Sequence, residues 1–101
     1  MRLLPQPMTF GWDEGNISKN LLKHDVTVQE AEEVFANEPL TLVDDSLHSV
    51  NEIRFHAFGK TKGDRKLFAA FTIRNNKVRI ISVRDMKRKE KLDYEKLEAN
   101  S

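Results

Sequence analysis

Residues 53–84 contain three strand-like segments in succession, and this run constrains the fold more than any other feature of the chain. Leu67–Arg74 is apolar on both of its alternating faces, which is typical of a central strand buried on both sides. A turn rich in Lys and Gly separates it from residues 53–59, and the tight turn Asn75-Asn76 leads into residues 78–84. Strands joined by short turns pair antiparallel, so the run predicts a meander.

Two helices are predicted ahead of the meander, after a short strand at residues 8–12. The first covers residues 14–24, with Asp13 as its N-cap. The second begins after Thr27, because Glu30 lies three residues later and completes a capping box. Its buried stripe consists of apolar residues at helical spacing, namely Ala31, Val34 and Phe35.

A further strand and a last helix complete the prediction. Pro39 ends the second helix, and residues 40–43 form a strand. Asp85 is expected to cap a charged helix at residues 86–98, whose few apolar contacts are Leu92, Tyr94 and Leu97. The order β-α-α-β-β-β-β-α predicts an α+β fold in which helices gather against an antiparallel sheet.

The length of 101 residues predicts one domain with one modest core. We assign residues 9–101 to this domain and residues 1–8, which hold two Pro, to an N-terminal arm. The chain has no cysteine, and its opening residues resemble neither a secretory signal nor a membrane span, so a cytoplasmic location is expected. Metal-ligand spacings and Gly-rich phosphate loops are absent from the sequence, and no cofactor is expected.

Charges of opposite sign are segregated along the chain. Residues 1–53 hold three basic and ten acidic side chains, whereas residues 54–91 hold thirteen basic and three acidic ones. The overall charge of +1 conceals this asymmetry. It indicates one basic face, which is the electrostatic footprint of a protein with a polyanionic partner.

Strand alternation sorts the basic residues between the two faces of the sheet. Arg54, His56 and Phe58 share the face opposite the core. In residues 78–84, Arg79 and Arg84 fall on opposite faces. Both arginines therefore reach one cleft only if the strand ends twist or a bulge intervenes.

Such residues fit RNA cleavage without a metal. That reaction needs a group that takes the proton of the 2′-hydroxyl, a group that protonates the leaving 5′-oxygen, and cations for the transition state. The candidates for proton transfer are His24, His48 and His56. For each of them, a purely structural role is the alternative. Ser82 lies inside a strand and not at a nucleophile elbow, so a serine hydrolase is not indicated.

The same residues occur in a specific order: Phe10-Gly-Trp12-Asp13, Lys23-His24-Asp25-Val26-Thr27, Glu52-Ile-Arg54, Arg74 and Arg79-Ile-Ile-Ser82-Val-Arg84. With this combination the chain resembles the BrnT toxin family from residue 10 to about residue 94. The resemblance implies a fold like that of the RelE-like ribonuclease toxins and metal-free RNA cleavage. It also implies a BrnA-like antitoxin with a ribbon-helix-helix DNA-binding domain, in a heterotetramer. Asp25 and Val83 depart from the usual Gly and Ala, and Asp25 requires a left-handed conformation at the helix end.

The resemblance also implies site residues. His24 is the expected acid or base, and Arg54, Arg79 and Arg84 are the expected contacts to phosphate and transition state. Glu52 supports the site or orients Arg54 through an ion pair. Trp12 and Asp13 are expected to be structural. The expected RNA-binding residues share a basic side chain near these positions: Lys23, Arg74, Lys87 and Arg88.

Two other functions fit the sequence. A non-catalytic module that binds nucleic acid or antitoxin would use the same basic face and leave RNA intact. A toxin scaffold that has lost its activity would still bind antitoxin, and Asp25 is the sequence feature that suggests it.

Overall fold

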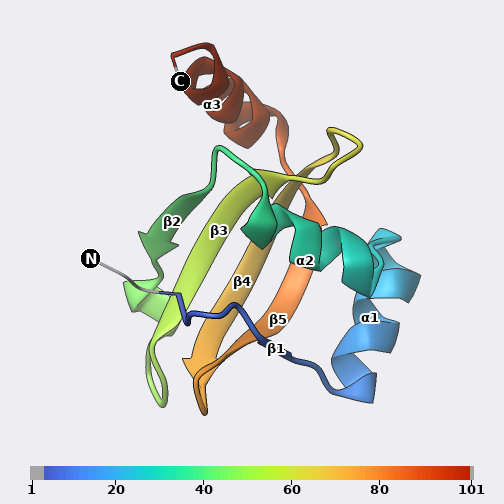
Figure 1. Ribbon diagram of the computed structural model, residues 1–101, viewed down its shortest axis with the longest axis vertical. Coiled ribbons are helices and arrows are strands. Elements are labelled where there is room, and N and C mark those ends of the chain that lie inside the picture. The colour runs from blue at the N-terminus through green and yellow to red at the C-terminus, as the bar shows by residue number, and fades with distance from the viewer. Residues whose placement is uncertain (1–3, 101) are drawn as a thin grey trace.

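A computed structural model describes residues 4–100, except for the side chains of Asn16, Asn20, Leu21 and Leu22. Figure 1 shows a mixed α+β domain with one sheet and three helices. The helices are α1 (Glu14–His24), α2 (Val28–Ala36) and α3 (Arg88–Ala99), and a 3₁₀ turn, η1, covers Ser46–His48. The strands are β1 (Phe10–Gly11), β2 (Thr41–Asp44), β3 (Arg54–Lys60), β4 (Lys66–Arg74) and β5 (Lys77–Asp85). The α+β class predicted from the sequence is confirmed.

The five strands lie in the order β1-β5-β4-β3-β2, with β4 at the centre. Strands β2 to β5 pair antiparallel, and Asn75 and Asn76 form the tight turn between β4 and β5 with φ values of 53° and 61°. Strand β1 pairs parallel with β5, so the prediction of a wholly antiparallel sheet was wrong at this edge. Sixty-seven residues separate the first paired positions, Phe10 and Val78, so no hairpin turn dictates the direction of β1.

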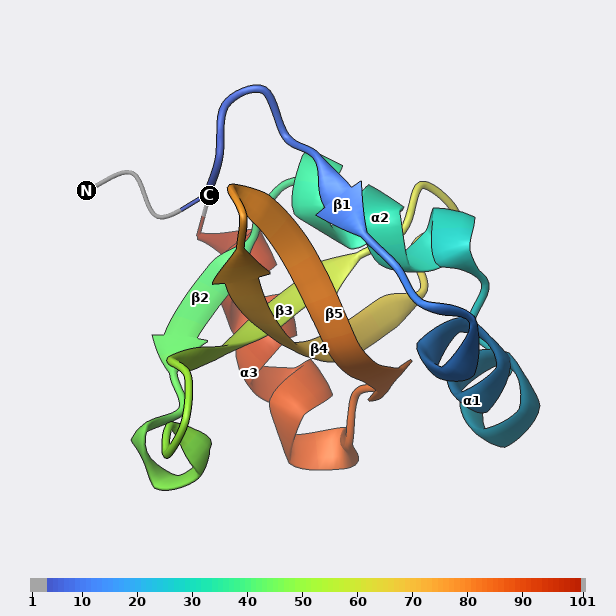
Figure 2. The same cartoon turned by 90° about the horizontal axis from the view of Figure 1, so that it is seen from below.

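Helix α2 covers one face of the sheet and supplies the centre of the core (Figure 2). Its capping box of Thr27 and Glu30 and its buried stripe are as predicted. Phe35 makes edge-on contacts with Phe71 and Phe10. Gly59 lets the helix approach closely, because an added Cβ would lie 2.8 Å from Val34 Cγ1 and 3.0 Å from the Val34 carbonyl oxygen. The core therefore fixes one face of the sheet as the inner face.

A bulge in β5 changes which residues share the other face. Ala70 pairs with Ser82, but the next residue, Phe71, pairs with Ile80, so Ile81 is the extra residue. One extra residue reverses the side-chain alternation on either side of it. As a result Arg79 and Arg84 lie on the same face, which is the condition that strand alternation alone left open.

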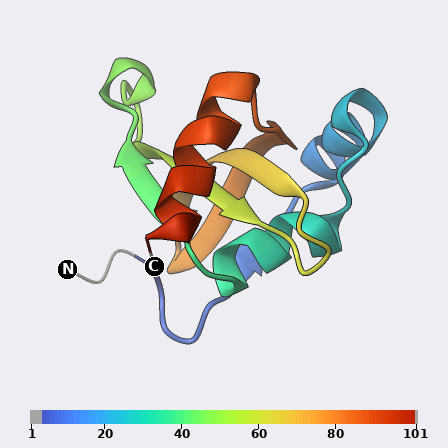
Figure 3. The same cartoon turned by 90° about the horizontal axis from the view of Figure 1, so that it is seen from above.

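Helix α3 lies on the face opposite α2, as Figures 2 and 3 show. It begins at Arg88 with Lys87 as its N-cap residue, so the prediction that Asp85 caps it was wrong. Asp85 ends β5 and pairs with Arg65 instead. Tyr94 is buried and donates a hydrogen bond to the Pro39 carbonyl, whereas Leu92 is 52% exposed. Tyr94 is therefore the buried anchor of this helix.

The N-terminal segment contacts the domain where it is described. Leu4 and Met8, within the predicted N-terminal arm of residues 1–8, pack against the core. Residues 1–3 of that predicted arm lie outside the described residues. Among residues 4–100, no helix has the length and apolar character needed to cross a membrane.

Candidate active site

The sheet face opposite α2 carries three rows of side chains that span β3, β4 and β5, and we call it the arginine face. Directly paired residues on antiparallel strands point to the same side of a sheet, so the strand register defines these rows. The rows are Arg54–Thr72–Arg79, His56–Ala70–Ser82 and Phe58–Phe68–Arg84. Three of the four predicted catalytic residues therefore share one face, together with His56.

Arg54 and Arg79 flank Thr72 and form the first row. Two strand spacings place their Cα atoms roughly 10 Å apart. Arg79 donates through Nη2 to Asp13 Oδ2 at 2.8 Å, so Asp13 has an ion-pairing role beside β5. Arg54 differs, because no carboxylate of the described residues pairs with it and its buried Nε has no hydrogen-bond partner. A guanidinium without a carboxylate is available to an anionic ligand.

His56 stands two residues from Arg54 and is held by Asp45. The His56 Nε2 atom lies 3.0 Å from Asp45 Oδ2, and the His48 Nδ1 atom lies 3.0 Å from both oxygens of the same carboxylate. Burial alone would raise the pKa of Asp45, but the hydrogen bond from His48 and the nearby imidazoles outweigh it and lower that pKa. The carboxylate is therefore an acceptor that orients two imidazoles, one of which lies on the arginine face.

Arg84 lies at the other end of the arginine face, beneath α3. Its guanidinium donates to both oxygens of Glu90, at 2.9 and 3.1 Å, and its central carbon lies 4.2 Å from the Phe68 ring centroid. The hydrogen bonds from Arg84 lower the pKa of Glu90 despite its burial. Arg84 thus joins α3 to the sheet, and its charge is already neutralised.

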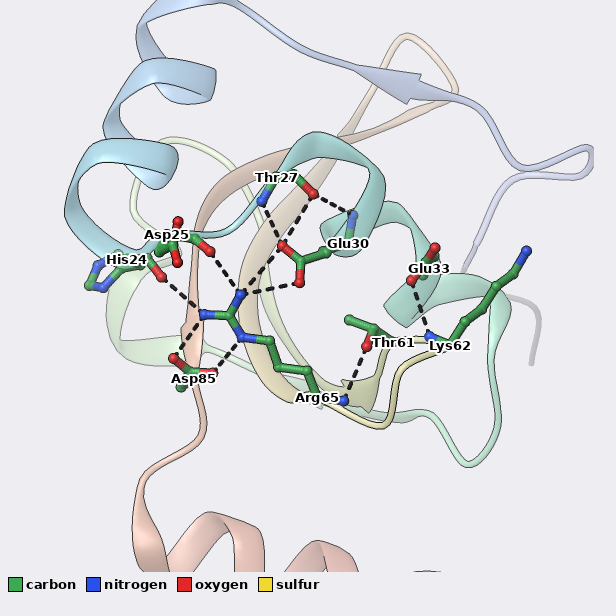
Figure 4. A network of polar contacts seen from close by, with 9 residues as sticks. All are labelled: His24, Asp25, Thr27, Glu30, Glu33, Thr61, Lys62, Arg65 and Asp85. Atoms are coloured by element: carbon green, nitrogen blue, oxygen red, sulfur yellow. Dashed lines mark hydrogen bonds and ion pairs between the residues drawn. The ribbon is translucent and has the colours of Figure 1, made fainter.

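His24 lies near the opposite end of β4 from Arg54. Figure 4 shows its carbonyl, together with that of Asp25, accepting hydrogen bonds from Arg65 at 3.1 and 2.8 Å. Arg65 also binds Asp85, which pairs with Leu67 of β4. Arg54 is opposite Thr72, five residues further along β4, or roughly 16 Å. The structure therefore does not bring His24 together with Arg54.

The Arg65 network fixes the end of α1. The Arg65 guanidinium is held by Glu30 at 3.2 Å and by Asp85 at 2.8 Å, and these carboxylates raise its pKa further above an already high value. Asp25 has φ of 54°, so it adopts the left-handed conformation expected where Gly is usual. The Arg65 contacts to the two carbonyls satisfy groups that a helix end leaves open.

The other predicted residues lie around the edges of the face. Glu52 pairs with Arg74 through Oε2 and Nη2 at 2.6 Å, so of its two predicted roles the ion pair that orients Arg54 is not formed. A hollow of about 470 Å³ nearby is lined by Leu47, His48, Val50, Asn51, Glu52, Arg54 and Arg74. A larger hollow of about 750 Å³ lies where α2 ends, and its Lys60 and Glu98 pair with each other. The exposed predicted RNA-binding residues Lys23, Lys87 and Arg88 lie on helices or their caps.

The sequence analysis missed Asp45 and Arg65. The available signal for the role of Asp45 was its place three residues before His48. Arg65 lay in a Lys- and Gly-rich turn with no periodicity, and its partners come from distant segments. Within residues 4–100, no cluster of His, Asp and Glu has an arrangement suited to a metal ion.

These features define a small α+β domain whose sheet carries three arginines and a histidine on the face opposite α2. The chain belongs to the BrnT family, because the family model described as "Ribonuclease toxin, BrnT, of type II toxin-antitoxin system" matches residues 12–90. At the level of the family, this implies ribonuclease activity, an RNA target and an antitoxin partner. A comparison with curated proteins finds no significant match.

Proposed function

We propose that this chain is a metal-independent endoribonuclease whose active site is the Arg54 end of the arginine face. One observation carries the proposal. Arg54 has no carboxylate partner among the described residues, whereas His56, on the same face, is bound to the Asp45 carboxylate. Arg54 is open to an anion, and His56 on the same strand is oriented by Asp45. RNA supplies the anion and the proton that these two groups require.

Arg54 and Arg79 bind the scissile phosphate in this proposal. Their spacing across Thr72 suits contacts to two sides of one phosphate group, and negative charge grows there as the 2′-oxygen attacks phosphorus. The P–O5′ bond then breaks and the leaving 5′-oxygen takes a proton from water, which yields a 2′,3′-cyclic phosphate and a 5′-hydroxyl end. Arg84 contributes once its contact with Glu90 opens, and Lys23, Arg74, Lys87 and Arg88 hold more distant phosphates.

His56 accepts the proton of the 2′-hydroxyl. When Asp45 accepts a hydrogen bond from Nε2–H of His56, the neutral ring presents Nδ1 as the base. The lowered pKa of Asp45 keeps it ionised, so it stabilises the imidazolium that forms. We assign this role to His56 instead of His24, because the His24 backbone is bound at the Arg65 end of the sheet.

The partner in this proposal is a BrnA-like antitoxin with a ribbon-helix-helix domain. Dimerisation of that domain would bring two toxin chains into a heterotetramer. We also propose that the fold is RelE-like, and the five-stranded sheet packed against α2 supports this proposal.

The decisive experiment follows labelled RNA over time in excess EDTA with three proteins. Wild type is expected to cleave, and His56→Ala to lose roughly 100- to 10,000-fold in rate, as removal of an acid–base group does. His24→Ala is the matched control and is expected to retain cleavage, because His24 lies on α1 and outside the proposed site. Circular dichroism checks that each variant is folded.

Other outcomes point elsewhere. RNA that binds with a steep salt dependence but stays intact would identify a non-catalytic binding module. Loss of cleavage in His24→Ala with full activity in His56→Ala would move the site to the Arg65 end of the sheet.

A further inference from the structure

The loop between β2 and β3 exposes three large aliphatic side chains. Leu47 is 83% exposed, Val50 84% and Ile53 65%. We call residues 45–53 the apolar loop, and Figure 2 shows it projecting beyond the paired ends of the two strands. Isolated exposed aliphatic residues are ordinary, whereas a group of three within seven positions is typical of an interaction surface.

The apolar loop adjoins the proposed active site. Leu47 and Val50 line the hollow of about 470 Å³ that also contains Arg54 and Arg74. Glu52 neutralises Arg74, whereas Arg54 has no carboxylate partner among the described residues. A ligand that fills this hollow therefore needs apolar groups on one side and a negative charge on the other.

We propose that the apolar loop and Arg54 together dock an acidic amphipathic segment of the antitoxin. Aliphatic side chains of the segment pack on Leu47 and Val50, and a carboxylate pairs with Arg54. This inference rests on the proposed function, because the carboxylate then occupies the place of the scissile phosphate. Neutralisation is the direct result of occupying the site.

The chemistry of the apolar loop favours a protein over RNA. Single-stranded RNA is held by stacking of its bases on aromatic or arginine side chains, and residues 45–53 contain no aromatic residue. A second copy of this chain is also a poor fit. A symmetric contact would place the same patch on both sides, so that the two Arg54 charges approach each other.

The test separates antitoxin binding from RNA cleavage. The double variant Leu47→Ser/Val50→Ser is compared with wild type, using as probe the purified product of the reading frame beside the gene. Binding is expected to weaken at least about 100-fold, because central apolar contacts carry most of the affinity of an interface. Cleavage of labelled RNA is expected to stay within about twofold, since neither side chain is charged or transfers protons.

Leu92→Ser is the control, because Leu92 is an exposed aliphatic residue that lies on α3 and outside the apolar loop. It is expected to bind the antitoxin as wild type does. Wild-type affinity for the antitoxin in the double variant would overturn the proposal. If that variant also cleaved RNA more slowly, the loop would be assigned to RNA binding instead. If wild type cleaves no RNA but the double variant still loses antitoxin, the docking surface stands and the proposed function falls.

Discussion

Arg54 and Arg65 lie toward opposite ends of β4 and have opposite surroundings. Arg65 binds two carboxylates and two backbone carbonyls, and these contacts join α1, α2 and β5. Arg54 has a buried Nε without a partner and faces a hollow lined partly by aliphatic side chains. The Arg65 guanidinium therefore holds the fold, whereas the Arg54 guanidinium has no carboxylate partner among the described residues.

The presence or absence of a carboxylate partner distinguishes arginines that hold the fold from candidates for ligand binding more clearly than charge density does. Both residues belong to the strongly basic segment 54–91, so the sequence alone does not distinguish their roles. Their difference comes from the carboxylates that the tertiary structure brings to each. An arginine that keeps its positive charge uncompensated beside an oriented imidazole is the stronger candidate for function.

The largest expected effect is that of Arg54→Ala on catalysis. The rate of RNA cleavage should fall by roughly 100- to 1,000-fold, as when a single transition-state donor is lost. The free energy of unfolding should change by less than about 1 kcal/mol, because no carboxylate is left unpaired. Single-turnover kinetics and urea unfolding measure the two effects.

Arg54→Lys refines this prediction, because Lys keeps the charge but loses the planar fork of donors. An intermediate rate would support a bidentate contact with phosphate. Cleavage by Arg54→Ala at the wild-type rate would remove Arg54 from the site altogether.

Local signals predicted most of the secondary structure. The capping box of Thr27 and Glu30 fixed the start of α2, and Asn75-Asn76 adopts the two positive φ values of a tight turn. The bulge at Ile81 had no such signal, since Ile80 and Ile81 are equally apolar. Whether Arg79 and Arg84 share a face depended on that one residue. The sequence therefore showed that a bulge would bring the two arginines together, but not that a bulge is present.

The second expected effect is on stability, through Arg65→Ala. The variant leaves Glu30 and Asp85 without their cation and the carbonyls of His24 and Asp25 without a donor. The free energy of unfolding should fall by about 2–3 kcal/mol. This is less than the roughly 3–5 kcal/mol lost when one partner of a fully buried ion pair is removed, because the Arg65 side chain is 27% exposed. Urea unfolding at neutral pH measures the loss.

The same variant tests where catalysis occurs. With the site at the Arg54 end, folded Arg65→Ala protein should cleave RNA at nearly the wild-type rate. A loss of cleavage in protein that is shown to be folded would instead indicate that the end of α1, with His24, takes part in the reaction.

The candidate site was less predictable than the fold, because its residues meet through tertiary contacts. Alternation correctly placed Arg54 and His56 on one face. The partners did not follow from spacing: Asp45 binds His56 across the end of the β2–β3 pair, and Glu52 binds Arg74 and not its near neighbour Arg54. A carboxylate near two cations in sequence does not reveal which of them it neutralises in space.

The smallest expected effect is a pH dependence confined to the Arg65 end. The backbone hydrogen bond at Thr27 and the contact with Arg65 lower the pKa of Glu30 from 4.5, and the hydrogen bond from Arg65 lowers that of Asp85 from 3.8. Groups whose pKa is lowered by folding stabilise the protein above these ordinary values, and the contribution disappears as the pH falls through the lowered ones. The stability gap between wild type and Arg65→Ala should therefore narrow in acid. Arg54→Ala should follow wild type at every pH, because no carboxylate pairs with Arg54. Urea unfolding of the three proteins at a series of pH values measures both gaps, and a gap for Arg65→Ala that stays constant into acid would show that its carboxylates contribute little.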